Sequence, residues 1–137
     1  MRRRQLSTAA AVLGVLLLAG PAAAGQASML DSSDASAFMG TWVIAVESPR
    51  GGTIDQTLIV RDEGGKVAAR LEFGRGGPND ITDIARVGDD LVLTFEREGR
   101  GGVNEVVMTV TLDGEMINTE MSFGGGQFSL NGTGKKQ

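Results

Sequence analysis

The sequence predicts an all-β protein that folds as an eight-stranded antiparallel up-and-down β-barrel. Two interleaved series of turns are the first observation behind this prediction. Arg-Gly-Gly occurs three times, 25 residues apart, at 50–52, 75–77 and 100–102. Acidic turns alternate with these triplets, at 62–65, 88–90 and 113–115. Two turn series with one period indicate consecutive β-hairpins, and they give the array one basic and one acidic end.

The second observation is the alternation of apolar and polar residues between the turns, which has the two-residue period of a β-strand. It defines eight expected strands, at 41–47, 53–61, 66–73, 79–87, 91–98, 103–112, 115–123 and 127–134. Every connection is short enough to join antiparallel neighbours. Eight meandering strands would leave two unpaired edges, so we expect the first strand to pair with the last and close a barrel.

The residues expected to face the barrel interior are mostly apolar and of medium size, with few aromatic rings. A barrel of eight strands has room either for its own side chains or for one small ligand. A filled barrel and a barrel with a ligand cavity therefore both stay open as interpretations.

The first 24 residues have the features of a cleaved signal peptide. Three arginines, Arg2 to Arg4, precede an apolar run at 9–19, and Ala22-Ala23-Ala24 matches a cleavage site. We therefore expect three parts, namely a signal peptide at 1–24, a polar N-terminal lead at 25–37 and the barrel domain at 38–137. Export to the periplasm or outside the cell would follow the general secretory route or the twin-arginine route.

Composition excludes several classes of function. Loss of the three leader arginines would take the net charge from −4 to −7, which disfavours binding to nucleic acid. The chain has no Cys, His or Tyr, so it lacks disulfides, imidazole metal ligands and the usual nucleophile–base pairs. The acidic turns lack the ligand spacing of a calcium loop. We expect a protein that is not an enzyme, with no catalytic residue, metal site or cofactor.

Gly40-Thr41-Trp42, at the start of the first expected strand, resembles the Gly-x-Trp signature of lipocalins and the wider calycin group. The chain is also similar to small secreted bacterial lipocalin-like domains with Gly-rich loops. The resemblance covers about 38–137. It implies that Trp42 plugs the closed end of a barrel and that Lys135, or else Lys136, lies across its ring. The chain is shorter than true lipocalins and lacks their cysteines and their long C-terminal helix, which puts a deep hydrophobic cup in doubt.

The phase of the turns places the arginine triplets at the end opposite Trp42, where a lipocalin has its open mouth. Arg50, Arg75 and Arg100 would then ring the mouth, and convergent cations at such an opening attract anions. In the alternative interpretation these are ordinary flexible turns whose arginines supply solubility.

Polar residues are expected to interrupt the apolar lining near this mouth. The 25-residue repeat projects Leu58 onto Asp83, which would face inward and pair with Phe95, one diagonal step from Arg97. The expected ligand-binding residues are Arg97, Asp83, Gln56, Phe73, Phe95 and Phe123. A few placed polar groups among apolar walls are typical of a small-molecule site. The alternatives are a bulge that turns Ile84 inward and leaves Asp83 in solvent, or a purely structural ion pair.

Two classes of function follow. The first is a carrier or sensor for a small apolar or amphiphilic ligand with an anionic head, bound inside the barrel. The second is an interaction module or inhibitor with a filled barrel, which contacts another exported protein. We expect neither a nucleic-acid partner nor a membrane span in the mature protein, and a monomer or a weak homo-oligomer.

Overall fold

The computed structural model describes residues 27–73, 77–99 and 102–137. The expected signal peptide at 1–24 and two of the three turn arginines, Arg75 and Arg100, lie outside the described residues. Within the described ranges, no helix is long and apolar enough to cross a membrane.

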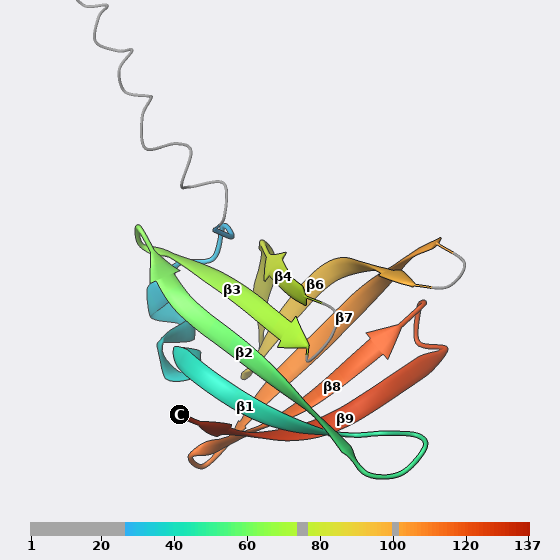
Figure 1. The fold of residues 1–137 in the computed structure, drawn as a ribbon. Helices are drawn as coiled ribbons and strands as arrows, with labels where there is room; N and C mark the ends of the chain where they lie inside the picture. The colour runs from blue at the N-terminus through green and yellow to red at the C-terminus, as the bar shows by residue number, and fades with distance from the viewer. Residues whose placement is uncertain (1–26, 74–76, 100–101) are drawn as a thin grey trace, which may run out of the picture.

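Nine strands form one antiparallel sheet that curls into a nearly closed barrel (Figure 1). In chain order they are β1 (Gly40–Glu47), β2 (Thr53–Glu63), β3 (Lys66–Phe73), β4 (Gly77–Ile81), β5 (Asp83–Val87), β6 (Asp90–Gly99), β7 (Gly102–Asp113), β8 (Met116–Phe123) and β9 (Phe128–Lys136). Their order in the sheet is β4-β3-β2-β1-β9-β8-β7-β6-β5. Pairing of β1 with β9 joins the first and last strands of the meander, so the all-β up-and-down architecture is confirmed.

The predicted number of eight strands is wrong by one, because the strand expected at 79–87 is broken at Thr82. Its first half, β4, pairs with β3, and its second half, β5, pairs with β6. Ile81 and Ile84 are both buried although they are three residues apart, a spacing that puts side chains on opposite faces of a continuous strand. The break lets both face the core, and it leaves β4 without pairing to β6.

The segment ahead of β1 packs onto the barrel. Its backbone pairs with the edge of β3 beyond the end of β4, where Ser28 N–H donates to Val67 O at 2.8 Å. A 3-10 helix, η2 (Ser32–Phe38), follows and buries Ala35 and Phe38 against the closed end of the barrel (Figure 1). The segment is kinked at Ala35, whose φ of −132° and ψ of 22° are not helical, so η2 consists of two short turns joined at a buried residue.

Two side chains of the barrel hold η2 in place. Trp42 Nε1 donates to Phe38 O at 2.9 Å. Arg86, on β5, donates from Nη1 to Asp34 O at 2.5 Å, and its guanidinium lies 5.7 Å from the centroid of the Phe38 ring. The closed end is therefore covered by a plug that the N-terminal segment supplies.

The basic residue over Trp42 is Lys136, not Lys135. Lys136 Nζ lies 5.3 Å from the centroid of the Trp42 ring. Trp42 and Lys136 are Cα partners between β1 and β9, so their side chains share a face, whereas Lys135 is the partner of Val43 and points to the other face.

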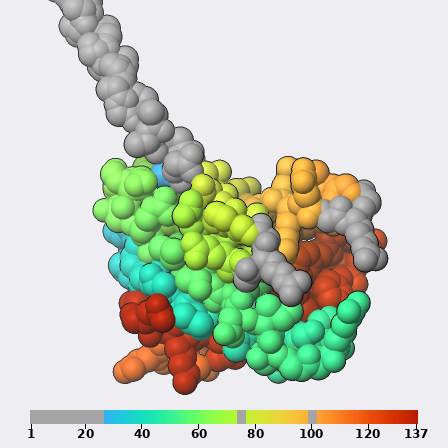
Figure 2. All heavy atoms as spheres, viewed as in Figure 1, coloured from blue at the N-terminus to red at the C-terminus, as the bar shows by residue number. Residues whose placement is uncertain are grey.

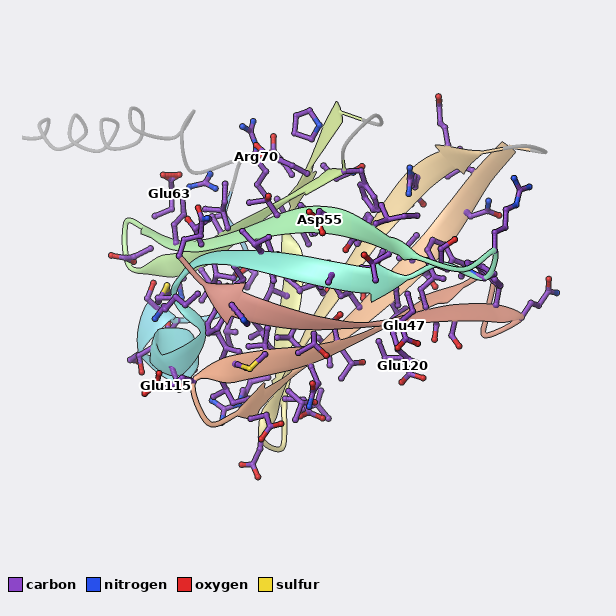
Figure 3. The ribbon with its side chains drawn as sticks, turned by 60° about the horizontal axis from the view of Figure 1, so that its bottom comes forward. Glu47, Asp55, Glu63, Arg70, Glu115 and Glu120 are labelled. Atoms are coloured by element: carbon purple, nitrogen blue, oxygen red, sulfur yellow. The ribbon has the colours of Figure 1, made fainter. Side chains whose placement is uncertain are left out.

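Apolar side chains fill the closed half of the barrel. Large ones that are at most 2% exposed include Trp42, Ile44, Leu58, Leu71, Ile81, Leu91, Leu93, Met108, Ile117 and Met121. Figure 3 shows side chains from both walls meeting in the interior, while the labelled Glu47, Arg70 and Glu120 lie on the outside. This half of the interior is therefore a packed core.

Candidate functional site at the mouth of the barrel

The inward face of the barrel changes character towards the mouth, the end that carries the β1–β2 and β8–β9 turns. Apolar side chains continue there, and their exposed fraction rises from 8% for Phe95 to 46% for Phe128 and 48% for Ile54. The rings of Phe123 and Phe128 lie with centroids 5.6 Å apart. Figure 2 shows the surface hollowed at this end, between the green atoms of the β1–β2 turn, the yellow atoms of β4 and the orange ends of β6 and β7. The mouth is thus a shallow cup with aromatic walls.

Gln56 lies on β2 at the boundary between this cup and the packed core. It is 2% exposed and is the Cα partner of Ile44 on β1 and of Phe73 on β3. Its Nε2 donates to Met121 Sδ at 3.5 Å, and its Oε1 has no hydrogen-bond partner among the described residues. A buried polar atom without a partner costs about 1–3 kcal/mol, so Gln56 Oε1 is an acceptor open to a donor that reaches it from the mouth.

Arg97 reaches this site from the opposite edge of the sheet. It lies on β6, is partly buried, and places its guanidinium carbon 3.9 Å from the centroid of the Phe73 ring on β3. It forms no ion pair with any carboxylate in the described part of the chain. The structure therefore brings Gln56, Phe73 and Arg97 together, with one hydrogen-bond acceptor and one cation beside an aromatic ring.

Asp83, predicted to face inward beside Arg97, is exposed on the outside. Its Cα partner is Thr94 and not Phe95, and the buried residue at this point is Ile84. The cause is the break at Thr82, which shifts the register by one residue and so turns every following side chain to the other face.

The other predicted positions divide as follows. Phe95 and Phe123 lie with Gln56, Phe73 and Arg97 on the inward face near the mouth. Arg50 is exposed in the β1–β2 turn at the same end, and it is the only one of the three expected rim arginines that the structure describes. Phe128 is not among the predicted site residues, and its contact with Phe123 adds it to the cup.

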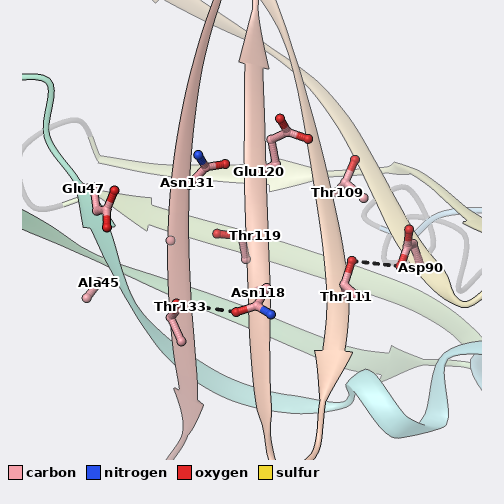
Figure 4. Close-up of a pocket in the computed structure, with 11 residues that line it drawn as sticks. Ala45, Glu47, Asp90, Thr109, Thr111, Asn118, Thr119, Glu120, Asn131 and Thr133 are labelled. Atoms are coloured by element: carbon pink, nitrogen blue, oxygen red, sulfur yellow. Dashed lines mark hydrogen bonds between the residues drawn. The ribbon is translucent and has the colours of Figure 1, made fainter.

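A second hollow, of about 520 Å³, lies on the outer wall across β1, β9, β8 and β7 (Figure 4). Its lining is polar, and part of it is internally hydrogen-bonded. Thr111 Oγ1 donates to Asp90 Oδ1 at 2.9 Å, and Thr133 Oγ1 donates to Asn118 Oδ1 at 3.5 Å. No buried unpaired polar atom among the described residues lies in this hollow, so we place the candidate site at the mouth.

The groups gathered at the mouth are suited to binding. The described residues contain no group of three acidic, His or Cys side chains that could hold a metal ion. A half-open aromatic cup with one cation and one unpaired acceptor is suited to a molecule that is apolar along most of its length and polar at one end.

No protein-family model and no curated protein matches the chain. Among solved structures, a redesigned β-barrel is similar to it. The two share 21% identity at a TM-score of 0.53, over 81% of this chain and 99% of the other. The fold is a β-barrel. At that identity the similarity concerns the fold alone.

Proposed function

We propose that this protein is an exported, non-enzymatic carrier or sensor that holds a small amphiphilic molecule with an anionic head in the mouth of its barrel. In this proposal it is a lipocalin-like domain of the calycin type with a shallow cup. The observation that carries the proposal is the buried and unpaired Oε1 of Gln56. Buried polar atoms are normally hydrogen-bonded, so an acceptor left free beside the cup is available to a donor on a ligand.

The geometry suggests how the ligand would lie. Its apolar part would cover Phe95, Phe123 and Phe128, since these rings line the cup. Its anionic head would pair with Arg97, which would leave the face of Phe73 to do so. A donor on the ligand, such as a hydroxyl or an amide N–H, would fill the free acceptor of Gln56.

Replacing Gln56 with leucine is expected to raise the free energy of unfolding by about 1–2 kcal/mol, because it removes a buried unpaired amide and keeps a side chain of similar volume. The same variant is expected to bind a fluorescent fatty-acid probe less well. Urea melts and fluorescence titration measure the two effects. Thr119→Val is the matched control, since Thr119 is also a buried polar residue, 5% exposed, but has no buried side-chain atom without a partner. Equal stability and equal affinity for Gln56→Leu and the wild type would remove the main support for the proposal.

Replacing Arg97 with leucine is expected to weaken binding of the same carboxylate probe by about tenfold to a hundredfold, the scale of a hydrogen bond to a charged group. The loss should persist at high salt, because the head would be partly buried. Arg50→Leu is the control, and it should mainly lower the association rate at low salt. The carrier proposal fails if the wild type does not bind the probe at tens of micromolar, or if Arg97→Leu binds it equally well.

The second candidate is an interaction module that contacts another exported protein. The fully packed closed half of the barrel favours it, because it leaves less room for a ligand than an open cup would. Native mass spectrometry of the protein purified from its own host separates the two candidates, since only a carrier would retain a small molecule.

A further inference from the structure

The barrel has an open seam, which we define as the gap between β4 and residues 95–99 of β6. The first half of β6, at 90–94, pairs with β5, and the whole of β6 pairs with β7. At 95–99 the side of β6 that faces β4 has no strand partner among the described residues, and β4 pairs only with β3. Two strand edges therefore face each other near the mouth without a ladder of hydrogen bonds between them.

Towards the closed end, the continuation of this gap is already filled by the backbone of the N-terminal segment. Where β4 leaves the edge of β3, the N-terminal segment takes its place. Val67 accepts from Ser28 N–H at 2.8 Å and donates to Leu30 O at 2.9 Å, and Asp31 forms an antiparallel bridge with Lys66. The barrel thus accepts an extended segment at one end of the gap, and the mouth end lacks one.

The open part of the seam has space and a definite charge pattern. A hollow of about 390 Å³ lies there, lined by Asn79 from β4 and by Glu96, Arg97 and Glu98 from β6. Both glutamates are exposed, and neither forms an ion pair within the described ranges. Along β6, Phe95 and Arg97 face inward and the two glutamates face outward. A strand laid beside β6 would meet Phe95 and Arg97 on its inner side and the two glutamates on its outer side.

We propose that the seam binds an extended segment of another protein as an added β-strand, with apolar residues facing the barrel alternating with Lys or Arg facing out. Unpaired strand edges are templates for such addition, and backbone hydrogen bonds then supply affinity while alternate side chains supply specificity. Glu96 and Glu98 would select the basic residues. This inference goes beyond the proposed ligand site, because it rests on the edge of β6 and not on Gln56.

The test uses a fluorescein-labelled peptide, Lys-Val-Lys-Val-Lys-Val with an amidated C-terminus, in anisotropy titrations with the whole protein at low salt. We expect saturable binding and slower backbone amide exchange at 95–99. Glu96→Lys together with Glu98→Lys should weaken binding by about tenfold or more. The matched control is Glu47→Lys with Glu120→Lys, the same change of charge on the outer wall (Figure 3), which should leave affinity within about twofold.

Four results would overturn the proposal. The first is no binding at about 1 mM peptide. The second is equal weakening by both double variants, which would show attraction to overall charge only. The third is unchanged binding of a peptide with alternate N-methylated residues, which cannot complete a strand ladder. The fourth is a dimer formed through residues 95–99 in sedimentation, which would assign the edge to a second copy. Gln56→Leu should not affect peptide binding, so failure of the ligand site and failure of the seam are distinguishable.

Discussion

Replacing Trp42 with alanine is expected to lower the free energy of unfolding by about 3–5 kcal/mol, the usual result of truncating a large buried aromatic side chain. Trp42 is 2% exposed and lies under both η2 and the end of β9. Its Nε1 also donates to Phe38 O at 2.9 Å, so the substitution leaves that buried carbonyl without its donor. Loss of one side chain thus loosens the barrel core and the helical plug together. Urea melts followed by far-UV circular dichroism measure the change.

Two control variants separate the contributions at this end. Trp42→Phe keeps most of the volume but removes the N–H, so it should cost less than alanine, about 1–3 kcal/mol. Lys136→Ala removes only the cation over the ring, at an exposed site, and should cost about 0.5–1 kcal/mol. A loss below about 1 kcal/mol for Trp42→Ala would show that Trp42 does not hold the barrel core and the η2 plug together.

The strands and their faces could be predicted from the sequence wherever the two-residue alternation was clean. Leu91, Leu93 and Phe95 on β6 face inward as expected, and so do Val106 and Met108 on β7. Period-two patterning over several residues fixes a face, because a slip by one residue would expose the whole apolar set. For the same reason Arg97 could be placed on the inward face of β6.

The break at Thr82 could not be predicted from a repeat, because the repeat assumes that all strands are continuous. Projection from Leu58 gave an inward Asp83. The spacing of Ile81 and Ile84 was the available signal for a break, since an unbroken strand cannot bury both. Burial of two isoleucines outweighs the pairing that the break gives up, and Asp83 goes to solvent as a consequence.

The unpaired carbonyl oxygen of Gln56 could not be predicted from the sequence, for a different reason. Alternation predicted that it faces inward, but its hydrogen bonding depends on what crosses the barrel to meet it. That neighbour is Met121 on β8, which offers a weak sulfur acceptor to the amide N–H and nothing to the carbonyl oxygen. A contact between residues 65 positions apart is set by closure of the sheet, and no local pattern encodes it.

Two glycines of β9, Gly132 and Gly134, face the barrel interior. The backbone of β9 lies so close to the interior that added Cβ atoms would overlap neighbouring side chains. At Gly134 a Cβ would lie 2.8 Å from Ile117 Cγ1 and 2.9 Å from Ile44 Cγ1, and at Gly132 it would lie 2.8 Å from Ile44 Cγ2. Both isoleucines are fully buried, so they have little room to move.

Replacing Gly134 with valine is therefore expected to lower the free energy of unfolding by about 2–3 kcal/mol through overpacking between β1 and β8. The matched control is Thr133→Val, which places the same side chain on the same strand but on the exposed outer face, and it should change stability by no more than about 0.5 kcal/mol. Urea melts of both variants give the comparison. Ile117→Ala removes the side chain nearest the new Cβ, so the double variant Gly134→Val with Ile117→Ala should lose less than the sum of the two single changes. Strict additivity in that cycle, or a Gly134→Val variant as stable as Thr133→Val, would show that β9 can move outward freely and that its glycines do not hold the barrel closed.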